Sequence, residues 1–303
     1  MRVLLAEPHH ERYAELLLAA EPQLQLCVGA TQAQLSAQAG VCDIWFGAPD
    51  LLVPLLRAGF KPRWLQSTWA GITPLLAAEL PRDYCLTRAV GIFGQLMAEY
   101  LLTYMLAHER QLLARHWDNT PAQGLAGRRV VLVGVGEIGT QVAHLFSALQ
   151  LQVFGVASQA RVQAPFQAVV NLAQLPSLLT QADYLINLLP DTPATQNLFA
   201  AQLFAQLPPS AVFINTGRGS AVVDADLVDA LTRGALAAAV IDVCRQEPPA
   251  AEHAFWTAPR LLLTGHSAAP TLPEPMVGLF LRNLQAYQAG TPLHGLVEFA
   301  RGY

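Results

Sequence analysis

Charged residues are scarce in this chain. Asp, Glu, Lys and Arg make up 13% of its 303 residues, whereas about a quarter is usual in soluble proteins. The formal net charge of −4 leaves no excess of basic side chains, so nothing in the composition indicates a nucleic-acid-binding surface. Because 53% of the residues are apolar, the chain is too hydrophobic to remain disordered.

Long hydrophobic runs are missing as well. Uncharged stretches such as 138–160 and 192–217 are interrupted by Gln, Asn, His or Pro. Neither contains the roughly 18 consecutive apolar residues that a membrane-spanning helix needs. The apolar run Val3–Ala6 is only a few residues long, which indicates a first buried strand and not a signal peptide. We therefore expect no membrane association.

Cysteines are few and widely spaced. The four, at positions 27, 42, 85 and 244, form neither a close pair nor a spacing typical of metal ligands. We expect free thiols in a cytoplasmic protein, and no metal site.

What the chain does have is a regular alternation of short apolar segments with helix-forming stretches. This alternation predicts parallel sheets covered by helices. In the first hundred residues the expected strands are 2–6, 24–28, 43–46, 64–67 and 84–86, and the expected helices include 14–20 and 51–56. A long helix over 96–116 follows. The alternation then restarts, with strands expected at 128–134, 153–156, 184–188, 212–215, 238–243 and 261–264, and with Asp224 capping a helix that Gly234 ends.

A glycine motif opens the second half. Gly134, Gly136 and Gly139 follow the apolar strand Val130–Val133 and precede an amphipathic helix. In this setting the first glycine permits a tight turn, the second lets the backbone approach a pyrophosphate, and the third lets helix and strand pack closely. The sequence therefore predicts dinucleotide binding at this loop, with Glu137 and Ile138 inside the motif.

The acidic residue that usually follows such a motif is absent. NAD sites carry Asp or Glu about 20 residues further on to hold the ribose 2′-hydroxyl, yet no acidic residue lies between Glu137 and Asp183. The second strand ends near Ser158, and Arg161 is the only cation of that interval. Both side chains suit a 2′-phosphate. The pattern favours NADPH and leaves NAD possible; alternatively, Arg161 is an ordinary exposed loop arginine.

Three strands of the second half end in unusual polar groups. Arg218 follows the strand that ends at Asn215, Glu247 follows the next strand, and His266 follows the last. Ligands of open α/β sheets lie beyond the carboxyl ends of the strands, so these side chains could meet at the cofactor. Singly, each is also compatible with a turn arginine, a solvated glutamate or a loop histidine.

At these residues the sequence resembles the D-isomer-specific 2-hydroxyacid dehydrogenases, over essentially the whole chain. The segments 215–219, 242–248 and 264–269 resemble the arginine, glutamate and histidine signatures of the family. The resemblance implies that Arg218, Glu247 and His266 form the catalytic trio. It also implies further cofactor contacts at Leu189, Pro190, Thr195, Thr216, Gly217 and Asp242, and substrate contacts at Trp45, Ala70, Gly71 and Ile72 as well as at Arg218.

The resemblance also implies a fold. It implies two doubly wound parallel-sheet domains with a cleft between them: a flavodoxin-like substrate domain formed by 1–98 and 270–303, and a Rossmann cofactor domain over 99–269. It implies a homodimer paired through the helix near 96–116. Two positions depart from the family pattern. Gly265 stands where a proline usually precedes the histidine, and Ala157 stands where the second strand usually ends in an acidic residue.

The activity so implied is reduction of a small 2-oxo acid to a 2-hydroxy acid. Trp45, Trp69 and the carboxyl-terminal segment are most similar to the glyoxylate/hydroxypyruvate reductase A subgroup. His266 would donate the proton, assisted by Glu247, while Arg218 binds the substrate. Two alternatives stay open. One is a formate- or phosphite-type dehydrogenase on the same scaffold, and the other is a dinucleotide-sensing protein without turnover.

Overall fold

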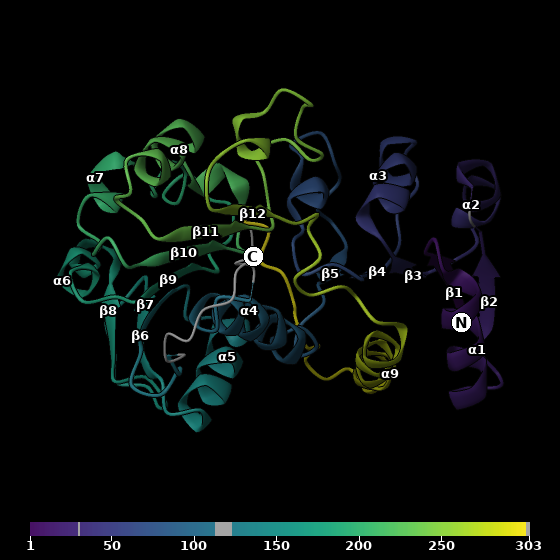
Figure 1. Ribbon diagram of the computed structural model, residues 1–303. Coiled ribbons are helices and arrows are strands. Elements are labelled where there is room, and N and C mark those ends of the chain that lie inside the picture. The colour runs from purple at the N-terminus through teal and green to yellow at the C-terminus, as the bar shows by residue number, and fades with distance from the viewer. Residues whose placement is uncertain (30, 113–122, 301–303) are drawn as a thin grey trace. The chain divides into compact units, whose positions relative to one another are not determined.

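The chain folds into two compact α/β units. The computed structural model describes residues 1–29, 31–112 and 123–300. One unit comprises 1–92 and 271–303, and the other comprises 93–270. Each unit is built on one parallel sheet with helices on both faces (Figure 1), which confirms the predicted fold class. The boundary between the units precedes α4 (Gly94–Glu109), whereas the sequence had placed it after residue 98.

The five-stranded sheet of the first unit has the order β2-β1-β3-β4-β5. This is the flavodoxin-like order, in which the strand sequence reverses beside the first strand. All neighbouring strands are parallel. Their bounds are β1 (Arg2–Ala6), β2 (Gln25–Val28), β3 (Ile44–Gly47), β4 (Trp64–Ser67) and β5 (Cys85–Thr87).

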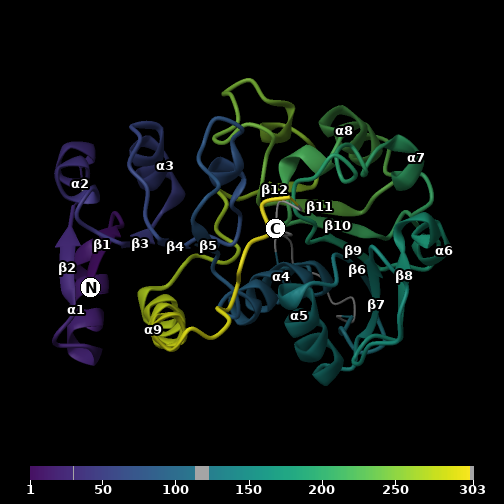
Figure 2. The ribbon, with the colours of Figure 1, turned by 180° about the vertical axis from the view of Figure 1, so that it is seen from behind.

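Two helices cover each face of this sheet. Helices α1 (His10–Ala20) and α9 (Pro273–Ala289) lie on one face, and α2 (Gln32–Ala39) and α3 (Pro49–Arg57) lie on the other (Figure 2). Phe280 of α9 stacks on Phe46 at 4.3 Å and on Trp64 at 5.3 Å between ring centroids. Such aromatic pairs add about 0.5–1.5 kcal/mol each beyond their burial, so they fix the carboxyl-terminal helix to the sheet.

Helix α2 was missed by the sequence reasoning. Its sequence is mostly Gln and Ala, so it presents no clear apolar stripe. The signal that could have found it is a capping box. Thr31 Oγ1 accepts a hydrogen bond from the Gln34 backbone N–H at 3.4 Å, and Gln34 Oε1 accepts one from the Thr31 N–H at 3.2 Å.

The seven-stranded sheet of the second unit has the order β12-β11-β10-β9-β6-β7-β8, with every pair parallel. Counted within the unit, this is the Rossmann order with one added edge strand. The bounds are β6 (Arg129–Val133), β7 (Gln152–Ala157), β8 (Ala168–Asn171), β9 (Tyr184–Asn187), β10 (Val212–Asn215), β11 (Ala238–Ile241) and β12 (Leu261–Leu263). Strand β8 is the one that the sequence reasoning missed.

Helices α4 and α5 (Glu137–Ala148) lie on one face of this sheet in Figure 1. The short helices α6 (Pro176–Leu179) and α7 (Ala201–Phe204) lie on the other face together with α8 (Asp224–Thr232). A hydrophobic core fills each side. The inner strands β6, β9, β10 and β11 are buried on both faces, which is why they are continuous apolar runs in the sequence.

Two local predictions are corrected. The helix expected over 96–116 ends at Glu109, and residues 113–116 lie outside the described part of the chain. Asp224 does not cap α8, because Val223 is the N-cap residue and Asp224 is already helical. The Asp224 carboxylate instead contacts His253 Nε2 at 3.3 Å. Gly234 follows the helix with a left-handed φ of +71°, as predicted for its end.

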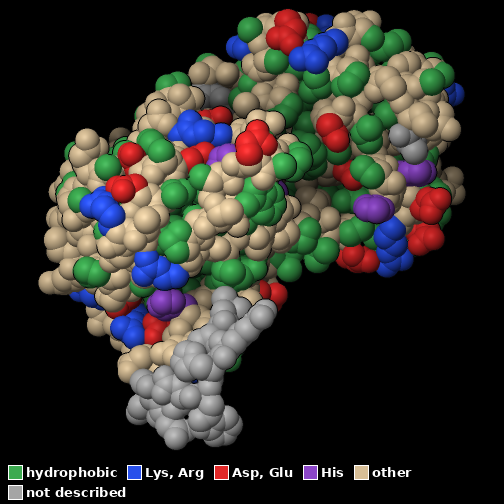
Figure 3. Space-filling view, turned by 45° about the horizontal axis from the view of Figure 1, so that its top comes forward, with side chains coloured by type: hydrophobic (Ala, Val, Ile, Leu, Met, Phe, Trp, Pro, Cys, Tyr) green, Lys and Arg blue, Asp and Glu red, His purple; other side chains and the backbone are tan. Residues whose placement is uncertain are grey.

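The described helices include none that is long and apolar enough to cross a membrane. On the face of the molecule in Figure 3, acidic and basic side chains lie interspersed among apolar and uncharged ones. That face therefore shows no extended patch of one charge.

A buried carboxyl group lies where the strand order of the first sheet reverses. Glu7 follows β1 and is only 8% exposed, and the hydroxyl of fully buried Thr68 donates a hydrogen bond to it. Burial raises the pKa of Glu7 to about 7; the Thr68 hydrogen bond opposes this rise and the charge of Asp50 adds to it. The carboxyl is therefore costly to ionise in the folded chain.

This cost predicts a pH-dependent stability. Below the ordinary pKa near 4.5, Glu7 is protonated in both states. As the pH rises toward 7 the unfolded chain loses the proton first, so the stability falls. Since one pKa unit corresponds to about 1.4 kcal/mol, Glu7→Gln should raise the free energy of unfolding by on the order of 2 kcal/mol at pH 8 and by little at pH 4.5. Urea unfolding at both pH values measures this, with exposed Glu11→Gln as control. An equal effect at the two pH values would contradict it.

Candidate active site and dinucleotide cradle

The loops of interest in the second unit all follow carboxyl ends of strands. The strand order reverses between β6 and β9, which are neighbours in the sheet. Open α/β sheets bind ligands at this switch point, because the loops on its two sides diverge to opposite faces. The glycine motif follows β6, and the loop starting at Leu188 follows β9.

A side chain at each of the three motif glycines would meet different surroundings. Gly134 has φ +120°, and a Cβ there would lie 2.9 Å from the carbonyl carbon of Leu188. A Cβ on Gly139 would lie 2.1 Å from the Gly134 carbonyl oxygen. Gly134 thus lets the turn after β6 lie against the loop after β9, and Gly139 lets α5 pack against the end of β6. A Cβ on Gly136 would meet nothing within 4 Å, so this position adjoins open space.

That open space is suited to a pyrophosphate. Gly136 is the N-cap residue of α5, and no side chain caps this helix end. The first-turn N–H groups and the positive end of the helix dipole therefore face the space beside Gly136. The residues present fit a dinucleotide phosphate group.

A cation lies across the glycine loop. Arg161 Nη2 donates a hydrogen bond to the Val135 carbonyl at 3.0 Å, and its Nε donates to Gln163 Oε1 at 2.7 Å. Ser158 is exposed just beyond the end of β7, which is Ala157. The edge of the cradle therefore presents a guanidinium and a hydroxyl where NAD-specific proteins present a carboxylate.

The loop after β9 is held by its own hydrogen bonds. Thr195 is 8% exposed, and its hydroxyl donates to the Pro190 carbonyl at 2.9 Å. The Leu189 N–H donates to Asn187 Oδ1 at 3.0 Å. Thr195 thus shapes the loop that carries Leu189 and Pro190.

Two buried asparagines link the ends of β9 and β10, and the sequence reasoning gave neither of them a role in the site. Asn187 Nδ2 donates to Asn215 Oδ1 at 2.8 Å, and the hydroxyl of Thr216 donates to the Asn187 carbonyl at 3.3 Å. The available signal was an Asn at the end of each of two apolar strands, because polar groups buried at such positions need partners. This link sets the direction of the following residues Gly217 and Arg218.

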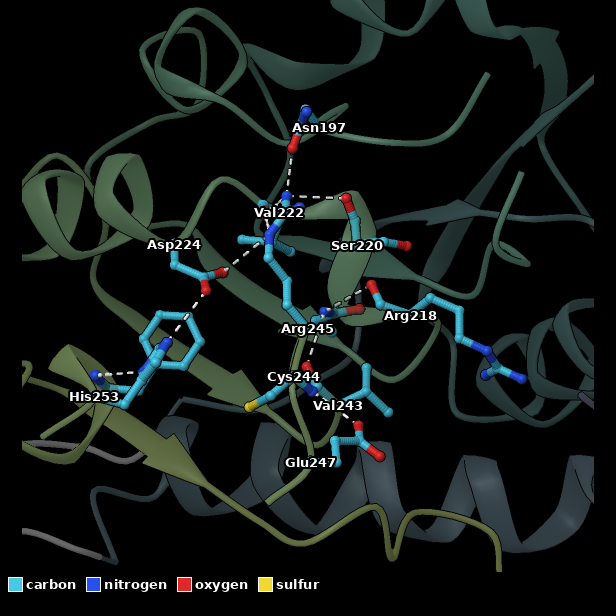
Figure 4. Close-up of polar contacts among 12 residues, drawn as sticks. Asn197, Arg218, Ser220, Val222, Asp224, Val243, Cys244, Arg245, Glu247 and His253 are labelled. Carbon is cyan, nitrogen blue, oxygen red and sulfur yellow. Dashed lines mark hydrogen bonds and ion pairs between the residues drawn. The ribbon is translucent and has the colours of Figure 1, made fainter. Parts of the chain in front are cut away.

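Arg218 is half-buried, and its Nη1 donates to the Gly217 carbonyl at 2.6 Å. Burial lowers the pKa of Arg218, while the charges of Glu247 and Asp191 oppose that shift. The Arg218 side chain extends away from the polar cluster around Arg245 (Figure 4). Its guanidinium stays charged, because the ordinary pKa of Arg lies far above neutrality.

Glu247 and His266 form a hydrogen-bonded pair. His266 Nδ1 and Glu247 Oε2 are 2.7 Å apart, and Glu247 Oε1 accepts a hydrogen bond from the Cys244 N–H at 2.9 Å. The side chains of His266 and Glu247 are 56% and 38% exposed. Because Nδ1 is engaged, Nε2 is the nitrogen that can meet a ligand.

The turn that carries His266 is braced by Asp242. This carboxylate is 3% exposed and accepts hydrogen bonds from Thr264 Oγ1 at 2.6 Å, from Ser267 N at 2.8 Å and from Ala268 N at 3.0 Å. The His266 N–H donates to the Asp242 carbonyl at 2.8 Å. His266 itself has a left-handed φ of +53°. The turn therefore forms with Gly265 in place of the usual proline, and Asp242 lies beneath it.

The substrate-contact residues expected in the first unit differ in their exposure to solvent. The loop Trp69–Ile72 follows β4, with Trp69 exposed and Ile72 buried. Ser67 Oγ accepts a hydrogen bond from the Trp69 N–H at 3.1 Å and fixes the start of the loop. Trp45 is fully buried in the hydrophobic core of the first unit.

In the parts of the chain that the structure describes, no three His, Cys, Asp or Glu side chains gather as metal ligands. The polar side chains at the strand ends are engaged with one another and with the backbone instead.

Comparison with known proteins gives the family. The family model for the NAD binding domain of D-isomer specific 2-hydroxyacid dehydrogenases matches residues 96–268, more than half of the chain. The chain belongs to the D-isomer specific 2-hydroxyacid dehydrogenase family. It is an α/β oxidoreductase of this class, and the matched region contains the glycine cradle, Arg218, Glu247 and His266.

Relatives within the family cover nearly the same length. The chain is 34% identical over 250 residues to the glyoxylate/hydroxypyruvate reductase A of Serratia proteamaculans, which spans 77% of this chain and 79% of that one. A crystal structure of a family member from Aeromonas salmonicida superposes with a TM-score of 0.92 at 37% identity, covering 98% and 99% of the two chains. The NADPH-dependent glyoxylate/hydroxypyruvate reductase of Sinorhizobium meliloti, crystallised with NADP and sulfate, gives a TM-score of 0.85 at 28% identity, covering 100% and 99%.

The glycine geometry yields a prediction that separates binding from folding. Gly136→Ala places a methyl group in open space, so the melting temperature should stay within about 2 °C of the parent, since a surface change of this kind is usually worth less than about 0.5 kcal/mol. The same methyl group obstructs the approach of a pyrophosphate to the backbone, so NADPH affinity should fall at least tenfold. Gly139→Ala is the contrasting variant and should lower the melting temperature. Thermal unfolding and NADPH fluorescence titration measure the two effects; parent-like NADPH affinity in Gly136→Ala would contradict this site.

Proposed function

We propose that the protein reduces small 2-oxo acids, such as glyoxylate and hydroxypyruvate, to 2-hydroxy acids with NADPH. The observation that carries the proposal is the 2.7 Å pair of His266 and Glu247, which stands on the same sheet edge as Arg218 and the glycine cradle. The names of the Serratia and Sinorhizobium relatives support the choice of substrates.

The proposed chemistry assigns a role to each member of the trio. The guanidinium of Arg218 binds the substrate carboxylate and polarises the 2-carbonyl with its fixed set of donors. His266, protonated, donates the Nε2 proton to the carbonyl oxygen, so that the oxygen becomes a hydroxyl. Glu247 stabilises the imidazolium and orients the ring through Nδ1. The bound cofactor supplies the hydride that adds to the carbonyl carbon.

We assign cofactor binding to the second unit. The proposed contacts are the motif residues Gly134, Gly136, Glu137, Ile138 and Gly139, together with Ser158, Arg161, Leu189, Pro190, Thr195, Thr216, Gly217 and Asp242. Arg161 and Ser158 are assigned to the 2′-phosphate, because the guanidinium already lies over the glycine loop. NADPH is the preferred form in this proposal, and NADH is accepted more weakly.

From the first unit, we propose that the backbone N–H groups of Ala70, Gly71 and Ile72 contribute to carboxylate binding. The loop begins at an ordered turn, where Ser67 Oγ and the Trp69 N–H are 3.1 Å apart. Short loops with several N–H groups pointing outward bind anions without a charged side chain.

We also propose a homodimer paired through α4. The second half of this helix carries exposed Leu106 and borders a pocket of about 720 Å³ whose lining includes Tyr104, Leu261 and Leu262. Apolar surface of this kind on a helix and an adjoining edge strand suits burial against a second copy. A particle of twice the chain mass of 32.7 kDa in sedimentation equilibrium is what this proposal requires.

His266→Asn tests the proposed proton donor. Loss of general acid catalysis should lower kcat for glyoxylate with NADPH about 100-fold or more, while NADPH affinity stays within about threefold. His144→Asn, on the exposed side of α5, is the matched control and should behave as the parent. Near-parent turnover in His266→Asn would remove this residue from the mechanism. A parent that oxidises formate or phosphite but does not reduce glyoxylate or hydroxypyruvate would favour the other dehydrogenase class, and tight NADPH binding without any turnover would favour a sensor.

Cofactor choice is tested by reversing the charge at the end of β7. A charge-assisted hydrogen bond is worth about 1.5–3 kcal/mol, and about 1.4 kcal/mol is tenfold, so Arg161 could favour NADPH by one to two orders of magnitude. Its exposure to solvent places the effect at the low end. Ala157→Asp with Arg161→Ala should reverse the preference in kcat/KM toward NADH. Equal kcat/KM of the parent for the two cofactors, or a preference for NADH, would overturn the assignment.

A further inference from the structure

One side chain outside the proposed trio connects the loops that carry it. Arg245 lies between Cys244 and Glu247 in sequence and is half-exposed. Its Nε donates to the Val222 carbonyl at 3.0 Å, and its Nη2 donates to the Ser220 carbonyl at 3.0 Å. Nη2 also donates to the Val222 carbonyl and to the side-chain oxygen of Asn197 (Figure 4). One guanidinium therefore spans three separate segments.

Each of these segments carries part of the proposed site. Ser220 and Val222 belong to the segment that begins with Arg218. Asn197 ends the loop that holds Leu189, Pro190 and Thr195, and its N–H donates to the Ser220 carbonyl at 2.9 Å. Arg245 itself stands on the segment of Glu247. The guanidinium joins the arginine segment, the cofactor loop and the glutamate segment.

The arginine and glutamate segments also touch directly. A Cβ on Gly219 would lie 2.0 Å from the carbonyl carbon of Cys244 and 2.3 Å from the Arg245 nitrogen. The two backbones are therefore packed against each other with no side chain between them. Because the Cys244 N–H holds Glu247 at 2.9 Å, a shift at this contact moves the carboxylate that pairs with His266.

The negative charge of Asp224 also helps to hold the Arg245 guanidinium in place. Arg245 Nε is 3.9 Å from Asp224 Oδ1, and the other oxygen of that carboxylate is 3.3 Å from His253 Nε2 (Figure 4). Burial raises the pKa of Asp224, while the charges of Arg245 and His253 oppose the rise. Asp224 thus anchors the guanidinium to the start of α8, and α8 packs into the core of the same unit.

We propose that Arg245 is a positioning residue that sets Glu247 against His266, and Arg218 against the substrate, by tying their two segments to the cofactor loop. The proposal rests on the proposed function. Arg245 touches neither reacting group, and its effect is exerted through the backbone of Cys244 and Gly219. A misplacement of about 1 Å at a catalytic group is enough to cost about 100-fold in rate.

The test compares Arg245→Met, which keeps the apolar length and removes the donors, with Arg245→Lys, which keeps a cationic donor. Arg233→Met is the matched control, because Arg233 lies exposed at the end of α8 and pairs with Asp229 on that helix. With NADPH and glyoxylate, Arg245→Met should lower kcat ten- to a hundredfold and raise KM for the oxo acid severalfold. Arg245→Lys should recover part of the loss, and Arg233→Met should match the parent.

The pH profile provides a readout that lost stability alone would not change. When Glu247 moves away, the imidazolium loses its stabilising partner, so activity of Arg245→Met should fall at lower pH on the alkaline side than in the parent. A parent-like profile together with parent-like kcat in Arg245→Met would overturn the proposal. So would a loss of kcat in both Arg245→Met and Arg245→Lys with no shift of the profile.

A second measurement does not depend on turnover. The ring signals of His266, followed by proton NMR at one pH and assigned with His266→Asn, should differ in chemical shift between the parent and Arg245→Met, because the Nδ1 contact to Glu247 changes. If the parent fails to reduce any 2-oxo acid, the proposed function fails, and the NMR comparison still decides whether Arg245 positions Glu247. Unchanged His266 ring signals in Arg245→Met refute the positioning role whatever the activity.

Discussion

The hydrogen bond between His266 Nδ1 and Glu247 Oε2 depends on contacts throughout the carboxyl edge of the second sheet. Its two residues follow adjacent parallel strands, β11 and β12, so both turns leave the sheet on the same side. Buried Asp242 fixes the histidine turn through hydrogen bonds from Thr264, Ser267 and Ala268 and through its own carbonyl. The Cys244 N–H fixes the carboxylate. Without these supports, two partly exposed side chains would gain little from pairing, because exposed ion pairs contribute at most about 1 kcal/mol.

The dinucleotide cradle also lies at the carboxyl ends of parallel strands. Its shape depends on the space left by glycines, whereas the His266–Glu247 pair depends on hydrogen bonds. Gly134 lets the turn after β6 lie against Leu188, Gly139 brings α5 against the end of β6, and Gly136 leaves the uncapped helix end open. The cradle therefore offers backbone N–H groups, and Arg161 adds a charge beside them. Backbone donors and a helix dipole bind the phosphates of either cofactor, so discrimination is left to the few side chains at the end of β7.

The first unit also has a switch point at the carboxyl ends of its parallel strands, but different residues occupy it. Its switch point holds buried Glu7 and Thr68 in place of a glycine cradle. Thr68 directly precedes the loop Trp69–Ile72, and the Thr271 hydroxyl donates to the Thr68 carbonyl at 2.9 Å. Residues from both ends of the chain thus hold this loop, which is possible because α9 packs on β3 and β4 of the same sheet.

The sequence by itself determined the strands other than β8, the two α/β halves and the residues at the strand ends. Apolar runs predict buried parallel strands wherever helices cover both faces of the sheet. The glycine pattern predicts the cradle, because each glycine stands where a side chain would obstruct the turn, the helix or a ligand. The missing acidic residue after β7 was equally visible. Local patterns did not locate the end of α4 or reveal α2, because a helix end depends on packing, and a Gln- and Ala-rich helix has no apolar stripe.

Only the tertiary structure decided which polar groups meet. The enclosure of Trp45, the link between Asn187 and Asn215, the bracing of the His266 turn by Asp242 and the contacts of Arg245 all join segments distant in sequence. Their partners are mostly backbone carbonyls and N–H groups, which carry no sequence signal. An arginine that binds three carbonyl or amide oxygens looks, in the sequence, the same as an arginine in solvent.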